Sequence, residues 1–187
     1  TYNDSGPIGV DWNIYSEKYD FQIKNSTGEY HGLVDMKTVL AKSLNTGMTF
    51  ISKKIGPALF YSYLEKFGFL DRTDIEFDQE VTGKIEYFED WTESELATHA
   101  FGQGMTITVV QLANAYSAIA NGGTLYEPSI IDDGRKPSRV RRVASTPTIA
   151  ALQEMLEDVV ENGTGLTARI PGYRVAGKTG TSRKLDR

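Results

Sequence analysis

The sequence predicts a helix-rich α+β fold. Apolar residues recur at helical intervals through the middle of the chain, in runs bounded by capping and stop residues. Alternating, strand-like runs lie mainly toward the end. The 187 residues, 40% hydrophobic and 24% charged, are typical of a soluble globular protein with one sizeable core. Because the chain has no internal repeat and no linker, we interpret residues 1–187 as a single domain.

The first segment, residues 1–32, is polar and aromatic, and it predicts little regular structure apart from the run "YDFQIKN", which fits a strand or an extended surface segment. A short helix is expected after Asp35, a good N-cap. The stretch "SLNTG" then breaks the helical pattern, and a second helix is expected after it. The apolar positions of these two helices are Met36, Val39, Leu40, Met48, Ile51 and Ile55. Ser43 and Asn45 are therefore expected at a joint between two helices.

A third helix is expected from Pro57, which suits a first helical position, to a stop at Gly68. Residues 69–96 are acidic and aromatic without a sustained period, which indicates a long excursion over the surface. Another helix follows, because Thr108 and Gln111 have the spacing of a capping box and apolar residues continue at helical intervals.

The last third of the chain mixes strands with one more helix. "TLYEPSII" and "SRVRRVAS" are expected to pair as a hairpin around the turn "DDGRKP". Thr146 is the expected cap of a helix that starts at Pro147 and stops at "NG". The final "YRVAGKTGTS" alternates and lacks helix formers, which predicts a strand. Four glycines are interpreted as turn positions that need permissive backbone angles, namely Gly102, Gly104, Gly163 and Gly165.

Charge and composition argue against several kinds of partner. A net charge of −5 and a pI near 5.1 disfavour a nucleic-acid surface, which needs clustered Lys and Arg. The chain has no cysteine, and neither His31 nor His99 has a second histidine at ligand spacing, so we expect no metal and no cofactor. No apolar run of about 18 residues is present.

One motif near the end admits two interpretations. Gly172, Gly177, Lys178 and Thr179 match the phosphate-loop pattern G-x-x-x-x-G-K-[ST], whereas "KTGT" is also typical of an active-site strand in penicillin-reactive enzymes. A phosphate loop needs a glycine-rich turn and then a helix, but bulky residues separate the two glycines and "GTSRKLDR" has no apolar helical face. A magnesium-binding carboxylate is offered only weakly, by Asp132. The strand is favoured, and a nucleotide-binding protein remains the lesser alternative.

Four segments in this order closely resemble the transpeptidase domain of penicillin-binding proteins of the class B type. They are "SLN", "FGQGMTITVVQLANAYSAIANGGTLYEPSII", "VVENGTG" and "VAGKTGTS". The resemblance extends over nearly the whole chain and is weakest over residues 1–32 and 69–96. It implies the fold that these proteins share with serine β-lactamases, an antiparallel sheet with helices, present here incompletely.

The resemblance also implies an activity. The family cross-links peptidoglycan stem peptides as a serine-type D,D-transpeptidase through an acyl-enzyme, and it binds β-lactam antibiotics, which imitate the donor peptide. This places the parent protein in the cell envelope, at the outer face of the cytoplasmic membrane, in cell division or elongation. Its implied partners are stem peptides and β-lactams, with no nucleic acid, and with membrane contact only through an N-terminal anchor that this chain lacks.

The same resemblance assigns roles to six residues. Ser43 and Lys178 are expected to be catalytic, with Ser43 passing a proton toward the leaving group and Lys178 supplying a fixed positive charge. The expected substrate-binding residues are Asn45, Thr179, Gly180 and Thr181, with the Thr181 N–H in the oxyanion hole. These roles require Ser43, Asn45 and Lys178 to converge in space. Taken alone, Ser43 and Asn45 also fit helix capping, and "KTGT" fits an exposed edge strand.

The chain departs from the family pattern at the nucleophile. No serine is followed by lysine three residues later, and the nearest approach is Ser138 with Arg141. In the family the S-x-x-K helix precedes the segment that begins at Thr1, and a further strand and helix follow the K-T-G strand. We therefore expect an internal fragment, a partial transpeptidase domain that is inactive alone. The alternative is a noncatalytic binding or scaffolding module of the cell envelope.

Overall fold

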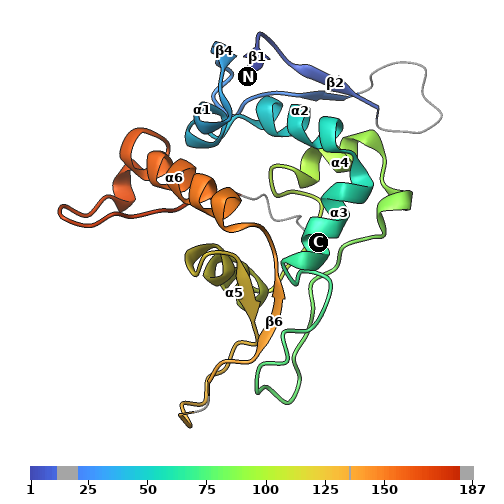
Figure 1. The fold of residues 1–187 in the computed structure, drawn as a ribbon. Coiled ribbons are helices and arrows are strands. Elements are labelled where there is room, and N and C mark those ends of the chain that lie inside the picture. The colour runs from blue at the N-terminus through green and yellow to red at the C-terminus, as the bar shows by residue number, and fades with distance from the viewer. Residues whose placement is uncertain (12–20, 135, 182–187) are drawn as a thin grey trace. The chain divides into compact units, whose positions relative to one another are not determined.

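The computed structural model describes residues 1–11, 21–134 and 136–181 (Figure 1). The chain divides into two compact units. The first unit comprises Thr1–Pro57, Glu89–Gly104 and Glu154–Arg187, and the second comprises Ala58–Phe88 and Met105–Gln153.

Two short antiparallel ladders open the first unit. Strand β1 (Tyr2–Asp4) pairs with β4 (Gly32–Val34), and β2 (Ile8–Val10) pairs with β3 (Phe21–Ile23). The expected strand in "YDFQIKN" is therefore present in its described part, and the other described residues between 1 and 32 are more regular than predicted.

Helices α1 (Met36–Ala41) and α2 (Asn45–Ile55) confirm the predicted joint, although α2 starts inside the "SLNTG" stretch that was expected to precede it. The Thr38 N–H donates to Asp35 Oδ1 at 2.8 Å, so Asp35 caps α1 as expected. The core beside the joint is a cluster of buried apolar side chains, namely Tyr2, Val34, Val39 and Leu44. This packing holds the N-terminal strands against the two helices.

Helix α4 (Glu93–His99) lies within and just beyond the segment interpreted as a surface excursion. It begins with a complete capping box between Thr92 and Glu95, whose T-x-x-E spacing is visible in the sequence. A one-turn 3-10 helix (Phe88–Asp90) precedes it. Ala97 packs with Val10 and Ile23 in a second core cluster, so the helix covers the β2–β3 ladder.

The second unit contains most of α3 (Pro57–Lys66), which starts at the predicted proline, and α5 (Val109–Ala120). The Thr108–Gln111 capping box is present. Strands β5 (Thr124–Tyr126) and β6 (Arg139–Arg142) form the predicted antiparallel hairpin. Their core contains Ala118, Leu125, Val143 and Ile149.

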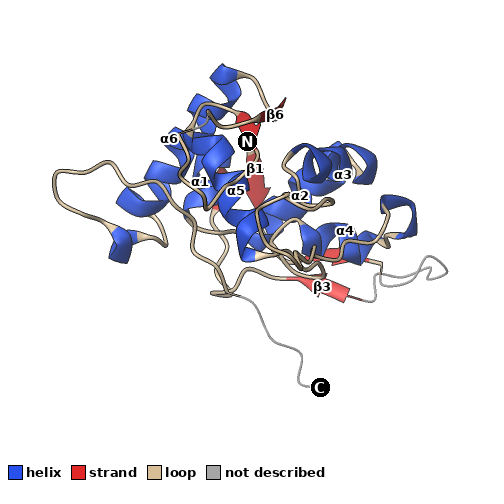
Figure 2. Cartoon of the chain, turned by 90° about the horizontal axis from the view of Figure 1, so that it is seen from below, coloured by secondary structure: helices blue, strands red, loops and turns tan. Residues whose placement is uncertain are grey.

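Helix α6 (Thr146–Asn162) starts one residue earlier than predicted, so Ser145 and not Thr146 is the cap. The Thr148 N–H donates to Ser145 Oγ at 3.3 Å. A 3-10 turn (Leu166–Ala168) follows. More of the described residues lie in helices than in strands (Figure 2), so the prediction of a helix-rich α+β fold is confirmed. None of the described helices is both long enough and apolar enough for a membrane span.

The four glycines divide into two kinds. Gly102 and Gly104 have φ angles of 88° and 78°, as turn positions that favour glycine do. For Gly163 and Gly165 that interpretation was wrong, because neither has a positive φ. A Cβ at Gly163 would overlap the Ala41 carbonyl oxygen, and one at Gly165 would lie 3.0 Å from the Val159 carbonyl oxygen. Close backbone approach is the reason for these two glycines.

The predicted strand around Lys178 is not present in the described residues. Residues 174–181 are neither strand nor helix, and Ser182 lies outside the described residues. Instead of a strand ladder, the Gly177 N–H donates to the Leu156 carbonyl oxygen at 3.1 Å. Alternation encodes a locally extended chain, but a strand also needs a paired neighbour. The absence of a helix at Lys178–Thr181 likewise removes the structure that a phosphate loop requires.

Candidate active site

Ser43 lies in the turn between α1 and α2, in a backbone conformation that usually selects glycine. Its φ is 54°, in the left-handed region. The Ser43 N–H donates to the Leu40 carbonyl at 3.1 Å and the Leu44 N–H to the Val39 carbonyl at 3.0 Å. This is the Schellman pattern of a helix C-terminus, completed by the packing of Leu44 against Val39. A non-glycine residue held in a strained position marks Ser43 as a candidate functional residue.

Lys178 reaches the strained serine. Its Nζ donates to Ser43 Oγ at 2.9 Å, and also lies 3.2 Å from both the carbonyl oxygen and Oγ1 of Thr179. Burial lowers the pKa of the Lys178 ammonium below its usual value of 10.5. The predicted convergence of Ser43 and Lys178 is therefore present, although 135 positions separate them in sequence.

A loop after α6 ties the Lys178 segment to the end of α1. The Thr164 N–H donates to the Ala41 carbonyl at 3.0 Å, and Thr164 Oγ1 lies 2.9 Å from Thr179 Oγ1. Gly163 makes this approach possible, because a side chain there would strike Ala41. The loop thus connects the turn that holds Ser43 with the segment that holds Lys178.

Asn45 is the first residue of α2, two positions beyond Ser43. Its Nδ2 donates to the Lys24 carbonyl oxygen at 3.0 Å, which fixes one side of the amide group. Ser43 and Asn45 flank the buried Leu44, so the tight turn places both polar side chains beside the same cleft.

These residues line one cleft of about 820 Å³ in the first unit. All six residues assigned by sequence contribute to it: Ser43, Asn45, Lys178, Thr179, Gly180 and Thr181. The volume lies in the range of small-molecule and peptide sites. Its walls combine the polar motif residues with apolar side chains from α1 and α2, namely Val39, Leu40 and Met48.

Sequence reasoning missed three other polar or aromatic residues of the cleft: Ser26, Phe101 and Gln103. Phe101 and Gln103 belong to "FGQG", where only the glycines were interpreted. Thr164, between the two glycines of "NGTG", also lines the cleft. In both cases the flanking glycines were the available signal, because they allow the backbone to bring the intervening side chain to a cleft.

The arrangement is suited to proton transfer and to binding an anion. Lys178 donates to Ser43 Oγ, so the serine's own hydroxyl proton remains available to an acceptor in the cleft. The ammonium and the exposed Thr179 and Thr181 hydroxyls form a donor-rich end that suits a carboxylate. The described part of the chain has no group of three or more His, Asp or Glu side chains that could hold a metal ion.

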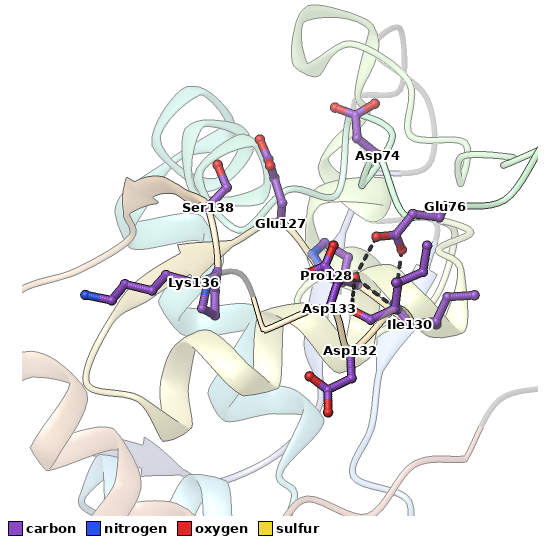
Figure 3. A pocket seen from close by; sticks show the side chains of 12 residues that line it. Asp74, Glu76, Glu127, Pro128, Ile130, Asp132, Asp133, Lys136 and Ser138 are labelled. Carbon is purple, nitrogen blue, oxygen red and sulfur yellow. Dashed lines mark hydrogen bonds between the residues drawn. The ribbon is translucent and has the colours of Figure 1, made fainter.

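A separate groove in the second unit is acidic (Figure 3). Its carboxylates come from Asp74, Glu76, Glu127, Asp132 and Asp133. Glu76 accepts hydrogen bonds from Ser129 Oγ and from the Ile130 N–H. Asp132, the weak candidate for a magnesium ligand, lies in the loop after β5 and not at the end of a strand. None of the motif residues lines this groove.

Comparison with known proteins gives a consistent result. The family model described as the penicillin binding protein transpeptidase domain matches residues 10–187. Penicillin-binding protein PbpB of Mycobacterium tuberculosis is 36% identical over 174 residues, covering 83% of this chain and 26% of that protein. Stage V sporulation protein D of Bacillus subtilis is 39% identical over 166 residues, again with 83% and 26% coverage.

Solved structures are similar over almost the entire chain. The D,D-transpeptidase domain of a peptidoglycan glycosyltransferase from Eggerthella lenta superposes with a TM-score of 0.85 at 25% identity, covering 99% of this chain and 48% of that one. Penicillin binding protein 3 of Mycobacterium tuberculosis, in complex with aztreonam, gives a TM-score of 0.82 at 30% identity, covering 99% and 43%. The chain therefore spans about a quarter of the curated relatives and about half of the solved chains.

Proposed function

Because this chain belongs to the penicillin-binding protein transpeptidase family, we propose that it forms the substrate-anchoring half of a serine-type peptidoglycan D,D-transpeptidase. In this proposal its cleft receives the donor stem peptide and the β-lactams that imitate it. The acyl-enzyme serine belongs to an S-x-x-K pair, which this sequence does not contain.

One observation carries the proposal: the 2.9 Å hydrogen bond from Lys178 Nζ to Ser43 Oγ inside a cleft that also contains Asn45 and the Thr179–Thr181 segment. Ser43 is held at a strained backbone position and Lys178 has a lowered pKa, which is unusual for residues with only a structural role.

Each residue has a proposed part in the reaction. Ser43 passes its hydroxyl proton to the leaving amine, or to the β-lactam nitrogen, and is reprotonated from the Lys178 side. Lys178, Thr179 and Thr181 hold the terminal carboxylate of the donor. Gly180 leaves room for the substrate beside the backbone, and the Thr181 N–H contributes to the oxyanion hole. Asn45 orients the amide of the substrate.

The proposed setting follows from the relatives, which are named as penicillin-binding proteins and D,D-transpeptidases. We place the full-length protein in the cell envelope, acting at the outer face of the cytoplasmic membrane on peptidoglycan stem peptides. We also propose that the full-length protein contacts the membrane through an anchor.

A covalent labelling experiment tests this function. The full-length protein that contains this chain is incubated with a fluorescent penicillin, denatured and examined by gel and by intact mass. We expect a covalent adduct, and Lys178→Ala should slow its formation by roughly 100-fold because a charge that anchors the carboxylate is lost. Its melting temperature should change little.

Two results would contradict the proposal. A folded full-length protein that forms no adduct would favour the noncatalytic binding module. An Lys178→Ala variant that loses labelling only in proportion to its loss of folded protein would show that Lys178 is structural.

A further inference from the structure

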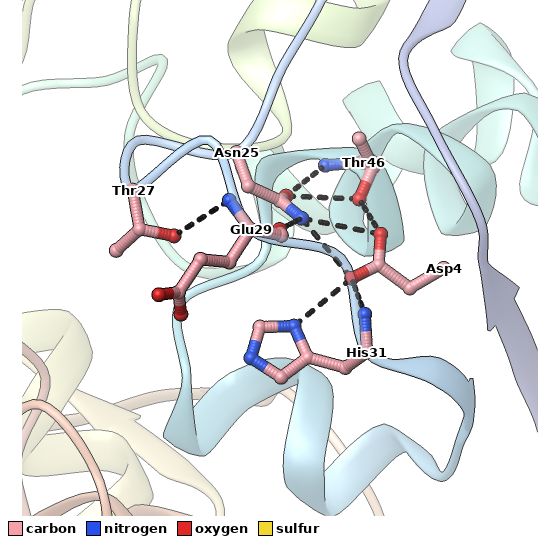
Figure 4. Close-up of polar contacts among 6 residues, drawn as sticks. All are labelled: Asp4, Asn25, Thr27, Glu29, His31 and Thr46. Carbon is pink, nitrogen blue, oxygen red and sulfur yellow. Dashed lines mark hydrogen bonds and ion pairs between the residues drawn. The ribbon is translucent and has the colours of Figure 1, made fainter.

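A buried carboxylate lies below the first turn of α2. Asp4, at the end of β1, has 0% of its surface exposed. Figure 4 shows the side chains that converge on it. Asp4 accepts from Thr46 Oγ1 at 2.8 Å, from Asn25 Nδ2 at 3.1 Å, and from the backbone N–H of His31 at 3.0 Å, while His31 Nδ1 lies 3.2 Å away.

The same network caps α2 from outside the helix. The N-cap residue, Leu44, has no side chain that can accept a hydrogen bond. Asn25 takes this role, because its Oδ1 accepts from the Thr46 N–H at 3.2 Å. The Asn25 Nδ2 also donates to the Glu29 carbonyl at 2.9 Å, which closes the turn that follows.

The partner of Asn45 directly precedes this turn. Lys24, whose carbonyl oxygen accepts from Asn45 Nδ2, is the residue before Asn25. Asp4 therefore supports both partners of the hydrogen bond between Asn45 and Lys24. It binds the hydroxyl of Thr46, next to Asn45, and the amide of Asn25, next to Lys24. Asn45 and Lys24 are each one residue away from a direct partner of Asp4.

Stability alone does not explain a charge at this position. Burial opposes ionisation of Asp4, but hydrogen bonds from Thr46, His31 and Asn25 outweigh it and lower the pKa of the carboxyl. A buried, fully paired carboxylate is often no more stabilising than a well-packed apolar group of the same size. The charged network instead fixes orientation, because several donors are held at set positions around the one carboxylate.

We propose that Asp4 is a positioning residue that sets the orientation of the Asn45 amide toward the substrate, acting through Thr46 and the Asn25–Lys24 turn. The inference rests on the proposed transpeptidase function. With one N–H of Asn45 held by Lys24, the carbonyl oxygen and the second N–H are left to pair with the amide group of the substrate. Loss of the carboxylate leaves that amide mispaired and the reacting carbonyl displaced.

The test uses Asp4→Asn in the full-length protein and two penam probes. One probe has an acylamino side chain, which supplies the amide that Asn45 recognises, and the other is a penam without that side chain. For each probe, the acylation rates of the variant and the wild-type protein are measured by quenching the reaction at set times and determining the intact mass. We expect a loss of roughly 10- to 100-fold with the first probe and less than about 3-fold with the second.

Two further variants separate positioning from folding. Thr46→Ser keeps the hydroxyl and should acylate at nearly the wild-type rate, whereas Thr46→Val should reproduce the probe-selective loss of Asp4→Asn. Val143→Ala truncates a buried side chain in the core of the second unit and serves as a destabilised control. It should lower the melting temperature without distinguishing the two probes.

The outcomes decide between the two claims. If the wild-type protein is labelled normally and Asp4→Asn loses acylation rate equally with both probes, the positioning role is overturned and the proposed function stays intact. A wild-type protein that is folded yet forms no adduct would overturn the proposed function, and the positioning role with it.

Discussion

Ser43 combines two requirements that conflict. The helix end needs a left-handed residue, for which glycine is the natural choice, and the cleft needs a hydroxyl that accepts from Lys178. A serine with φ of 54° satisfies the second at the expense of the first. Strain at this position is consistent with a role in chemistry, because a helix terminus alone gains nothing from it.

Exchange of this serine should therefore separate stability from activity. We expect Ser43→Gly to maintain or raise the free energy of unfolding, by up to about 1 kcal/mol, because glycine adopts the left-handed region without strain. The same variant should slow acylation of the full-length protein by roughly 100-fold, since the proposed proton relay through Ser43 is lost. Denaturant unfolding and penicillin labelling measure the two effects. Ser43→Ala is the matched control and should lose activity without gaining stability. A Ser43→Gly protein that is clearly less stable would contradict the strain argument.

At the scale of elements, the sequence predicted most features that depend on near neighbours, the Thr92–Glu95 capping box of α4 excepted, and missed pairings that depend on distant residues. The caps at Asp35 and Thr108 were predicted because each contact spans only three residues. The β1–β4 pairing joins residues about 30 positions apart and has no local signal. Thr164, which lines the cleft, contacts Ala41, and this contact is equally non-local. The motif residues were identified by their order in a known family, and their convergence could not have been derived from the spacing.

Helix α4 shows how burial links an element to pH. His99 is 5% exposed, packs edge-on against Trp91 with ring centroids 4.6 Å apart, and places Nε2 3.2 Å from the Gly104 carbonyl oxygen. Burial lowers the pKa of the imidazole below its usual value of 6.5. The folded state thus binds this proton less tightly than the unfolded chain does.

The free energy of unfolding should therefore fall as the pH decreases below about 6.5, where the unfolded chain takes up a proton that folded His99 does not. Above that pH, His99 is neutral in both states and contributes no slope. Urea unfolding of the chain at pH 8 and at pH 5.5 measures the difference. His99→Gln retains an N–H donor near Gly104 and cannot be protonated, so it should reduce the loss of stability between the two pH values. The same loss in wild type and His99→Gln would exclude His99 as its cause.

At the scale of the whole molecule, the chain has a cleft with the proposed binding and proton-relay groups but no serine activated by its own lysine. Ser43 is bound by Lys178, yet it lies in a turn and not at the S-x-x-K spacing that the family's nucleophile has. In the proposed function this chain supplies the noncovalent site, and the covalent step needs an S-x-x-K serine.

The 187-residue chain alone should therefore form no lasting bond with a penicillin. We expect no adduct by intact mass after incubation with the fluorescent probe, whereas the full-length protein under the same conditions should be labelled. Circular dichroism of the short chain provides the control for folding. A covalent adduct on the short chain, mapped to Ser43 or to any other serine, would show that the nucleophile has been assigned to the wrong place.

The three hydrogen bonds of Lys178 have a consequence for ligand design. An ammonium group has three protons, and here Ser43 Oγ, the Thr179 carbonyl and Thr179 Oγ1 accept them. An inhibitor that offers a carboxylate to Lys178 must therefore displace one of these acceptors, so it exchanges a hydrogen bond instead of adding one. The carboxylate is charged and the acceptor that it replaces is neutral, so the gain is limited to the difference between a charge-assisted and a neutral hydrogen bond. A noncovalent ligand therefore also needs contact with the apolar wall of the cleft.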